Sequence, residues 1–194
     1  MIGLWVALLV GAYLLGAIPF GLLVARRAAH IDVRTVGSGN IGATNVARAA
    51  GKKVAAVVLL LDMAKGFAPA LVARLLLPEP WWSGAVGFAA FVGHCFPIYL
   101  RFRGGKGVAT ALGVSLALVP LAALAGAVVY TAVYKAFRVS SLGSLSGALV
   151  ATTVAFVSAP SPAWAWAVVA MVAVIFARHG GNIRRLVRRE ESKV

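Results

Sequence analysis

The sequence has few acidic residues and almost no cysteine. Its 194 residues include five Asp and Glu in total, three His and a single cysteine, Cys95. One cysteine excludes an internal disulfide. The sequence offers neither a Cys/His set for zinc nor a cluster of carboxylates for magnesium. We therefore expect no metal and no cofactor, which argues against a metal-dependent phosphatase or nucleotidyltransferase.

Charged residues of any kind are scarce, and most of them are basic. Only 12% of the residues are charged and 61% are hydrophobic, and the formal net charge is +14. Soluble domains average about 25% charged residues, so a water-soluble fold would have too little polar surface. The sequence therefore predicts an integral membrane protein with one domain over residues 1–194. No basic region precedes the first apolar stretch, so we expect a retained span rather than a signal peptide.

Seven apolar blocks are candidates for membrane segments, which must be helical in lipid. The two blocks beside Pro120 would span only about 20 and 25 Å at about 1.5 Å per residue, so length favours one kinked helix there. The distribution of basic residues favours two separate helices there, because seven spans with an external N-terminus place 17 of the 19 Lys and Arg on the cytoplasmic side. We predict an all-α polytopic protein with seven transmembrane helices and a cytoplasmic C-terminus. The blocks are 2–25, 53–77, 83–100, 107–119, 121–137, 142–158 and 162–178.

The stretch VGSGNIGATN, residues 36–45, matches the dinucleotide-binding pattern G-x-G-x-x-G, and Asp62 follows its last glycine by 20 positions. That pattern needs a preceding strand and a βαβ unit. Here an apolar helix and a basic turn precede it, and Asp62 lies inside an apolar helix. The stretch can still bind phosphate through a nest of backbone N–H groups. The nest would form at Gly37, Gly39 and Gly42. Neutral side-chain donors come from Ser38, Asn40, Thr44 and Asn45, and Arg48 adds a charge if TNVARAA is helical.

Two further polar clusters follow apolar blocks. In GHCFPIYLRFRGGKGVAT, residues 93–110, His94 precedes the glycines and lysine Gly104, Gly105, Lys106 and Gly107, which suit an anion or a lipid headgroup. In RHGGNIRRLVRREE, His179 and Asn182 stand at i and i+3, close enough to share a helical face. The RRLVRR run is more typical of a headgroup anchor. Asp62 and Lys65, inside the second helix, are functional candidates or a mutually neutralising pair.

All three clusters are expected at one membrane face, so the simplest hypothesis is a single site for an anionic substrate. Two other classes remain open. A small transporter of organic phosphates would also need basic side chains between helices, but transporters commonly bind at the midplane between inverted repeats, and the sequence has no convincing repeat. A structural protein whose basic loops bind anionic lipid is the third reading. We expect the lipid bilayer and small anions as partners rather than nucleic acid, and the sequence does not indicate an oligomeric state.

Three signatures, GSGNIGATNVAR at 37–48, GHCFPIYLRFRGGKGVAT at 93–110 and HGGNIRRL at 179–186, resemble the PlsY family of bacterial membrane acyl-phosphate:glycerol-3-phosphate acyltransferases. The resemblance covers essentially the whole chain. It implies seven transmembrane helices in the inner membrane and an active site facing the cytoplasm. It also implies transfer of a fatty acyl group from acyl phosphate to the sn-1 hydroxyl of glycerol 3-phosphate. The products would be lysophosphatidic acid and phosphate, in the first acylation of phospholipid synthesis, without acyl-CoA or acyl carrier protein.

The resemblance also implies roles for individual residues. Ser38 and Arg48 would be required for activity, and Asn40, Thr44 and Asn45 would lie close to the substrates. Lys106 and its glycines would bind glycerol 3-phosphate with His94 nearby, and His179 and Asn182 would form the active-site pair. The family often continues the third signature as R-L-x-x-G-x-E. Here Arg189 stands at the glycine position and Glu191 follows, which puts the turn after Arg185 in doubt.

An acyl phosphate is a mixed anhydride, so the enzyme must chiefly align it with a hydroxyl and neutralise charge. We expect direct transfer without an acyl-enzyme, because Ser38 has no evident Ser-His-Asp partner set in the sequence. Ser38 would then be a hydrogen-bonding ligand. The proton acceptor stays open at this point: His179 as general base, or a substrate phosphate, the route that the resemblance favours.

Overall fold

The computed structural model describes residues 2–193, and over that range the chain is helical, without strands. Two short 3-10 turns interrupt ten α-helices. The elements are α1 (Ile2–Ala17), α2 (Phe20–Ala29), η1 (Val33–Thr35), α3 (Ala43–Ala50), α4 (Lys52–Leu76), α5 (Pro80–Cys95), η2 (Ile98–Leu100), α6 (Val108–Leu118), α7 (Pro120–Phe137), α8 (Ser140–Ser158), α9 (Pro162–Arg178) and α10 (Gly180–Val187).

Proline sets many of the helix boundaries. Pro80, Pro120 and Pro162 occupy the first positions of α5, α7 and α9, where the missing N–H costs nothing. Pro19 separates α1 from α2. The first apolar block, predicted as one helix over 2–25, is therefore broken at this proline and continues to Ala29 as a second helix.

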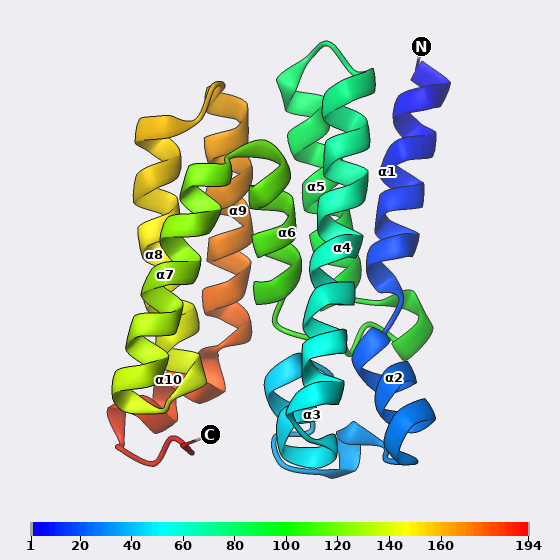
Figure 1. The fold of residues 1–194 in the computed structure, drawn as a ribbon. Coiled ribbons are helices and arrows are strands. Elements are labelled where there is room, and N and C mark those ends of the chain that lie inside the picture. Colours follow the sequence, from blue (N-terminus) through cyan, green and yellow to red (C-terminus); the bar gives the residue numbers. More distant parts are fainter. Residues whose placement is uncertain (1, 194) are drawn as a thin grey trace.

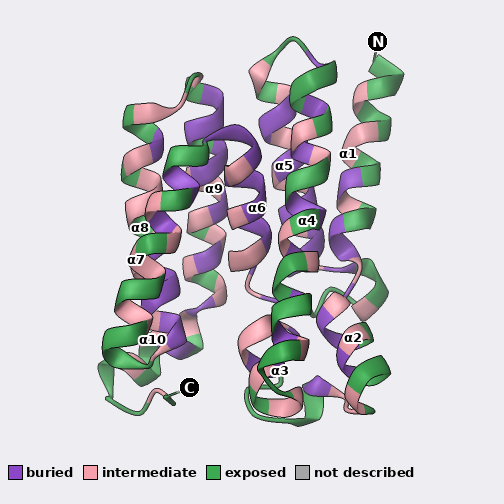
Figure 2. Ribbon diagram, in the orientation of Figure 1, coloured by how far each residue is buried: buried purple, intermediate pink, exposed green. Residues whose placement is uncertain are grey.

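The long helices form two groups with α6 between them (Figure 1). One group contains α1, α4 and α5, and the other contains α7, α8 and α9. The buried residues of the bundle centre come mainly from α5, α6 and α9, among them Phe91, Val114 and Met171, and buried positions face inward along most helices (Figure 2).

Neighbouring helices approach through small residues, as is common in membrane proteins. A side chain at Gly16 would meet the backbone of Ala90, which joins α1 to α5, and one at Gly66 would meet Thr110, which joins α4 to α6. Gly126 and Gly147 face each other where α7 crosses α8.

Five helical segments in the described range are long and apolar enough to cross a membrane, or six if α9 and α10, bent by 60°, count as one. The region around Pro120 is not one kinked helix, because α6 and α7 run side by side in opposite directions (Figure 1). With 11 residues, α6 is about 16 Å long, too short to cross the hydrocarbon alone.

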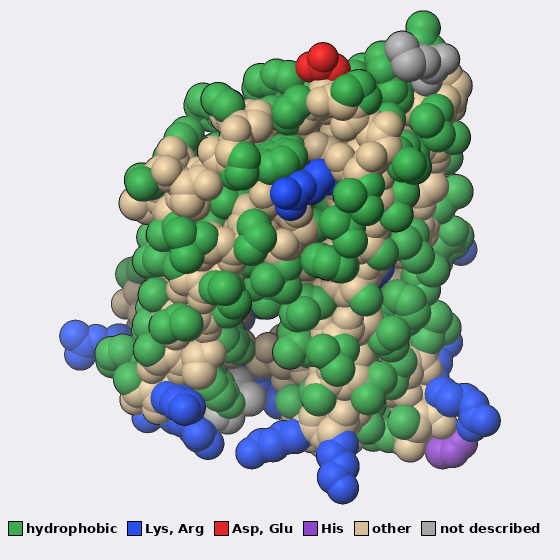
Figure 3. Space-filling model, turned by 45° about the horizontal axis from the view of Figure 1, so that its top comes forward, with side chains coloured by type: hydrophobic (Ala, Val, Ile, Leu, Met, Phe, Trp, Pro, Cys, Tyr) green, Lys and Arg blue, Asp and Glu red, His purple; other side chains and the backbone are tan. Residues whose placement is uncertain are grey.

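The two ends of the bundle differ in charge. The N-terminal end of α1 and the last described residues lie at opposite ends (Figure 1). On the face seen in Figure 3, Lys and Arg gather mainly at the end that carries α2, α3 and α10, whereas the acidic patch visible on this face lies at the other end. All five tryptophans fall at or near the opposite end, in α1 and in the first turns of α5 and α9.

Candidate active site

All three predicted clusters meet around one cavity of about 1200 Å³. Its wall also includes Asp62. Gly39, Gly104, Gly105 and Lys65 are not among the residues that line it. From the three clusters the cavity is lined by Gly37, Ser38, Asn40, Gly42, Thr44, Asn45, Arg48, His94, Lys106, Gly107, His179 and Asn182.

The first loop is held by Asn45, which is 2% exposed. Its amide nitrogen donates to the carbonyls of Val33 and Val36 at 2.8 and 2.9 Å, and its oxygen accepts the Ser38 N–H at 2.9 Å. Gly37 has a left-handed φ of 58°, which glycine adopts without steric cost. Asn45 thus fixes the turn that presents Ser38 to the cavity.

The predicted nest of backbone N–H groups is wrong for three of the groups it needs. The Ser38 N–H is taken by Asn45, the Gly39 N–H donates to the carbonyl of Val36 at 3.0 Å, and the Gly42 N–H donates to the side chain of Asn40 at 2.9 Å. These donors stabilise the loop itself, because each N–H group already has an acceptor within the loop or its flanking residues. Binding at this wall therefore falls to side chains, with Arg48 as the charged one.

The glycine-lysine loop is clamped from two sides. The Gly105 N–H donates to the His94 carbonyl at 3.1 Å, and a side chain at position 105 would collide with the His94 ring. From the other side, the Arg178 guanidinium donates to the carbonyls of Gly104 and Gly105 at 2.8 and 3.1 Å. Gly104 and Gly105 are thus needed for close packing behind the cavity wall, while Lys106 reaches the cavity.

Lys106 leads into a chain of polar contacts. Its ammonium donates to Asn182 Oδ1 at 2.7 Å, and the Asn182 amide donates to Glu191 Oε1 at 2.5 Å. Glu191 also accepts from Ser141 at 2.8 Å and from Arg185 Nε at 2.6 Å. Burial lowers the pKa of Lys106 against the opposing effect of Glu191, and the nearby Arg185, Arg48 and Arg178 lower it further.

The carboxylate of Glu191 stays ionised in this chain. Partial burial would raise its pKa, but the hydrogen bonds from Asn182, Ser141 and Arg185 outweigh burial and hold the pKa below its usual value. The turn that brings Glu191 back passes through Arg189, whose φ is 59°. Arg189 therefore adopts the left-handed conformation that the glycine of the resembling family would favour at this position.

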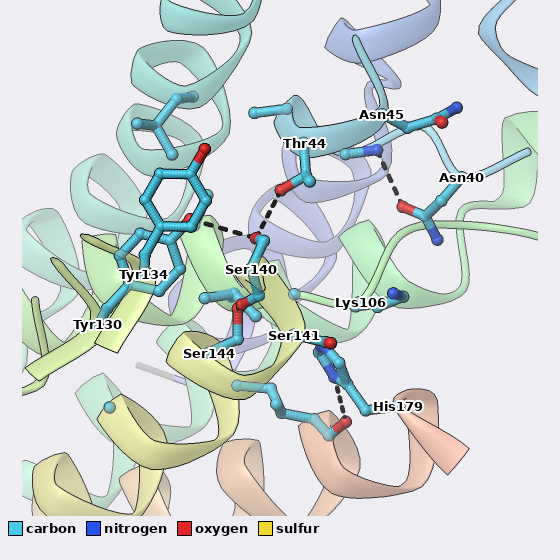
Figure 4. A pocket seen from close by; sticks show the side chains of 18 of the residues that line it. Asn40, Thr44, Asn45, Lys106, Tyr130, Tyr134, Ser140, Ser141, Ser144 and His179 are labelled. Carbon is cyan, nitrogen blue, oxygen red and sulfur yellow. Dashed lines mark hydrogen bonds between the residues drawn. The ribbon is translucent and has the colours of Figure 1, made fainter. Parts of the chain in front are cut away.

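His179 lies just beyond the last residue of α9 and is 2% exposed. Its Nδ1 is 2.8 Å from the carbonyl of Ile175, so Nδ1 carries the proton and donates it (Figure 4). Burial lowers the pKa of His179 to about 4, against the opposing effect of that hydrogen bond. The ring is therefore neutral at pH 7, and Nε2 is left as a proton acceptor.

A row of hydroxyl groups crosses the cavity and was not predicted. Ser140 at the start of α8 lies 3.0 Å from Thr44 Oγ1 and 3.2 Å from the Tyr130 hydroxyl (Figure 4). This contact joins α3 to the α7 and α8 pair. Ser141 and Ser144 line the same wall. The only sequence signal was the small Ser- and Gly-rich start of an apolar helix, SSLGSLSG.

The ion pair that was predicted inside the second apolar block forms, and it lies on α4. Lys65 Nζ is 2.8 Å from Asp62 Oδ1, and both side chains are at most 3% exposed. His94 Nδ1 lies 3.5 Å from the same oxygen, and Lys65 also donates to the Ile18 carbonyl at 2.8 Å. These contacts link the break between α1 and α2 to α4 and, through His94, to the glycine-lysine loop.

Away from the loops, the cavity becomes an apolar groove between helices. Four helices each contribute one face, because their lining residues recur at spacings of three and four. The lining residues are Ala55, Ala56 and Leu59 from α4, Val108, Ala111, Leu112 and Ser115 from α6, Ala123, Gly126, Ala127, Tyr130, Thr131 and Tyr134 from α7, and Ser144, Gly147 and Ala148 from α8. The cavity thus has a basic, hydrogen-bonding end and an apolar end. Within residues 2–193, no group of three or more His, Cys, Asp or Glu is placed to hold a metal ion.

Comparisons with known proteins agree on one family. Residues 6–189 match the family model described as glycerol-3-phosphate acyltransferase. A glycerol-3-phosphate acyltransferase of Anaeromyxobacter dehalogenans is 54% identical over 97% of this chain and 96% of its own, and that of Myxococcus xanthus is 53% identical over 96% and 98%. The crystal structure of PlsY (YgiH), an integral membrane glycerol 3-phosphate acyltransferase in its glycerol 3-phosphate form, is similar with a TM-score of 0.93. It is 40% identical over 98% of this chain and 95% of that one. The lysophosphatidic acid form of PlsY gives a TM-score of 0.91 at 39% identity, over 97% and 94% of the two chains.

Proposed function

The chain belongs to the glycerol-3-phosphate acyltransferase family, and on that premise we propose that it transfers a fatty acyl group from acyl phosphate to the sn-1 hydroxyl of glycerol 3-phosphate. The products are lysophosphatidic acid and phosphate. The similar PlsY structures, in glycerol 3-phosphate and lysophosphatidic acid forms, support the acceptor and the product. The acyl phosphate donor rests on the signatures and on the cavity.

The observation that carries this proposal is the two-part cavity. An acyl phosphate has a phosphate at one end and an apolar chain at the other, and the acceptor carries a second phosphate. The basic end offers Arg48, Lys106 and Arg185 to phosphate, while the apolar groove offers an alkyl chain a water-poor path. Charged donors held in a partly buried site stabilise phosphate most strongly.

We propose direct transfer in one site. The sn-1 oxygen attacks the acyl carbonyl, the bond between the carbonyl carbon and the phosphate oxygen breaks, and phosphate leaves with the electron pair. No hydrogen bond among the described residues joins Ser38 Oγ to a histidine or a carboxylate, which supports a role as a ligand rather than a nucleophile.

Two groups can accept the proton of the sn-1 hydroxyl. His179 can take it at Nε2, because Nδ1 already donates to the Ile175 carbonyl. Alternatively, an oxygen of a substrate phosphate can take it, in which case His179 orients the hydroxyl. Asn182 is fixed between Lys106 and Glu191 and acts by positioning Lys106.

Asp62 and Lys65 act in support. Both are buried, and neither is expected to contact the phosphates. They hold His94, and His94 holds the backbone of Gly105 next to Lys106. We propose that this ion pair fixes the position of the glycine-lysine loop relative to the helices.

We further propose seven passes through the inner membrane, with the basic end in the cytoplasm. Short α6 would be one pass together with the loop that precedes it. The excess of Lys and Arg at one end follows the positive-inside rule, and tryptophans gather at the other end, as at membrane interfaces.

The test is an assay with purified protein in detergent. Palmitoyl phosphate and labelled glycerol 3-phosphate, with a chelator and without CoA, should give lysophosphatidic acid and phosphate in equal amounts. Ser38→Ala and Arg48→Ala should each abolish most of the product. Thr35→Ala serves as a control, because that hydroxyl is exposed and donates to the Asp32 carbonyl, outside the residues that line the cavity. A folded wild-type protein that forms no product would contradict the proposal.

A further inference from the structure

The apolar groove ends in a closed pocket under the turn between α6 and α7. Ser115 on α6 and Ala123 on α7 are the lining residues farthest from the loops along their helices. From Gly107 to Ser115 the groove rises about 12 Å along α6, and from Tyr134 to Ala123 about 16 Å along α7. The groove is therefore of limited length.

The lining residues become less exposed along the groove, from the loops towards the turn between α6 and α7. Leu59 on α4 is 42% exposed and Thr131 on α7 is exposed, so the lower part opens sideways between these helices. The two groups of helices are separated there, and the surface is hollowed between them (Figures 1 and 3). Ser115 and Ala123, in contrast, are only 5% and 2% exposed. The upper end is thus enclosed by protein.

The end wall is part of the bundle core. Leu118, Val119 and Ala122 of the α6–α7 turn are at most 1% exposed and pack in the same cluster as Trp164 of α9. Cores of this kind are close-packed and yield little to an intruding group. An alkyl chain that reaches the end of the groove therefore meets a fixed wall.

We propose that this closed end limits the length of the acyl chain that the site accepts, and that Ala123 and Ser115 set the longest chain that fits. This inference rests on the proposed acyl transfer. The small side chains at the two positions leave room for the last carbons of the chain, and a larger side chain at either position would fill that room. Each carbon that loses its place in an apolar pocket costs roughly 10-fold or more in specificity.

The experiment compares two donors in the same protein. We expect Ala123→Leu to lower kcat/KM for palmitoyl phosphate at least about 10-fold relative to decanoyl phosphate, whose shorter chain does not reach position 123. Ser115→Val, on the opposite wall, should shift the ratio in the same direction by a smaller factor. Leu124→Ala is the matched control, because Leu124 is the next residue but faces outward and is 56% exposed. Its ratio should equal that of the wild type.

Activity with decanoyl phosphate shows that each variant is folded. If both variants lose activity equally with the two donors, or keep the wild-type ratio, the chain does not end in this pocket and leaves through the side opening instead. Either result overturns the inference while leaving the acyl transfer intact. A wild-type protein that uses neither donor overturns the proposed function and the inference with it.

Discussion

The polar end and the apolar end of the cavity are held in place by different interactions. At the polar end, hydrogen bonds hold functional side chains in place: Lys106 donates to Asn182, Asn182 donates to Glu191, and His179 donates to the Ile175 carbonyl. At the apolar end, small residues at helical spacing let the helices leave a gap, and the wall is the bundle core. A change at the polar end should therefore affect every acyl donor, whereas one at the apolar end should depend on chain length.

His179→Ala gives the largest expected effect at the polar end. We expect kcat to fall by the same factor for palmitoyl and decanoyl phosphate, since the ring acts at the reacting atoms. A loss near 10⁴-fold, the upper range for a general base, would assign the proton to Nε2, and a mild loss would assign it to a substrate phosphate. Single-turnover rates measure this step, and His30→Ala, at an exposed surface position, is the control. A loss that depends on chain length would contradict the division between the two ends.

Asp62→Leu tests the junction of the two ends. Removing one partner of a buried ion pair costs about 3–5 kcal/mol, whereas replacing both can be close to neutral. We expect the single variant to unfold at a much lower temperature in detergent, and Asp62→Leu with Lys65→Leu to recover most of the loss. The double variant should still have a raised KM for glycerol 3-phosphate, because His94 has lost the carboxylate 3.5 Å from its Nδ1, next to the glycine-lysine loop. A wild-type KM in the double variant would show that the pair only stabilises the fold.

Lys106→Met should lower kcat/KM by about 10²–10³-fold, the usual cost of removing one preorganised hydrogen-bond donor. The pH dependence is a sharper test. Burial holds the pKa of Lys106 below 10.5, so the ammonium loses its proton earlier than an exposed lysine as the pH rises. The KM for glycerol 3-phosphate should then rise with pH before an ordinary lysine would titrate. In Lys106→Arg this rise should disappear, because guanidinium stays charged. A rise that persists in the arginine variant would assign the titration to another group.

The polar end of the cavity could be predicted from the sequence, whereas the apolar end could not. The polar end could be located because its residues, such as Ser38, Lys106 and His179, are conspicuous in an apolar chain, and the cavity brings their clusters together. The helical class followed from composition. The apolar end left no signal, since alanine, serine and glycine at helical spacing are equally typical of lipid-facing or packed helices.

Other differences have local causes. The glycine-rich loop was expected to offer its backbone N–H groups to an anion, but Asn45 and Asn40 take two of them inside the loop, and the sequence cannot reveal which acceptor a donor will choose. The prediction of seven spans depended on Pro120, where charge and length disagreed. α6 has only 11 residues, because it begins after the glycine-lysine loop and ends before Pro120.

Arg189→Gly has the smallest expected effect and tests how tightly the polar end is fixed. Arg189 has a φ of 59°, which costs a non-glycine residue about 1–2 kcal/mol, and glycine recovers part of that despite its greater freedom when unfolded. We expect a gain of about 1 kcal/mol or less, measured as a higher melting temperature, with unchanged KM values. Arg188→Gly is the control, since its φ of −82° suits arginine and glycine there should destabilise. If Arg189→Gly also destabilises, the arginine side chain holds the turn, and Glu191 owes its place to that contact as well as to its own hydrogen bonds.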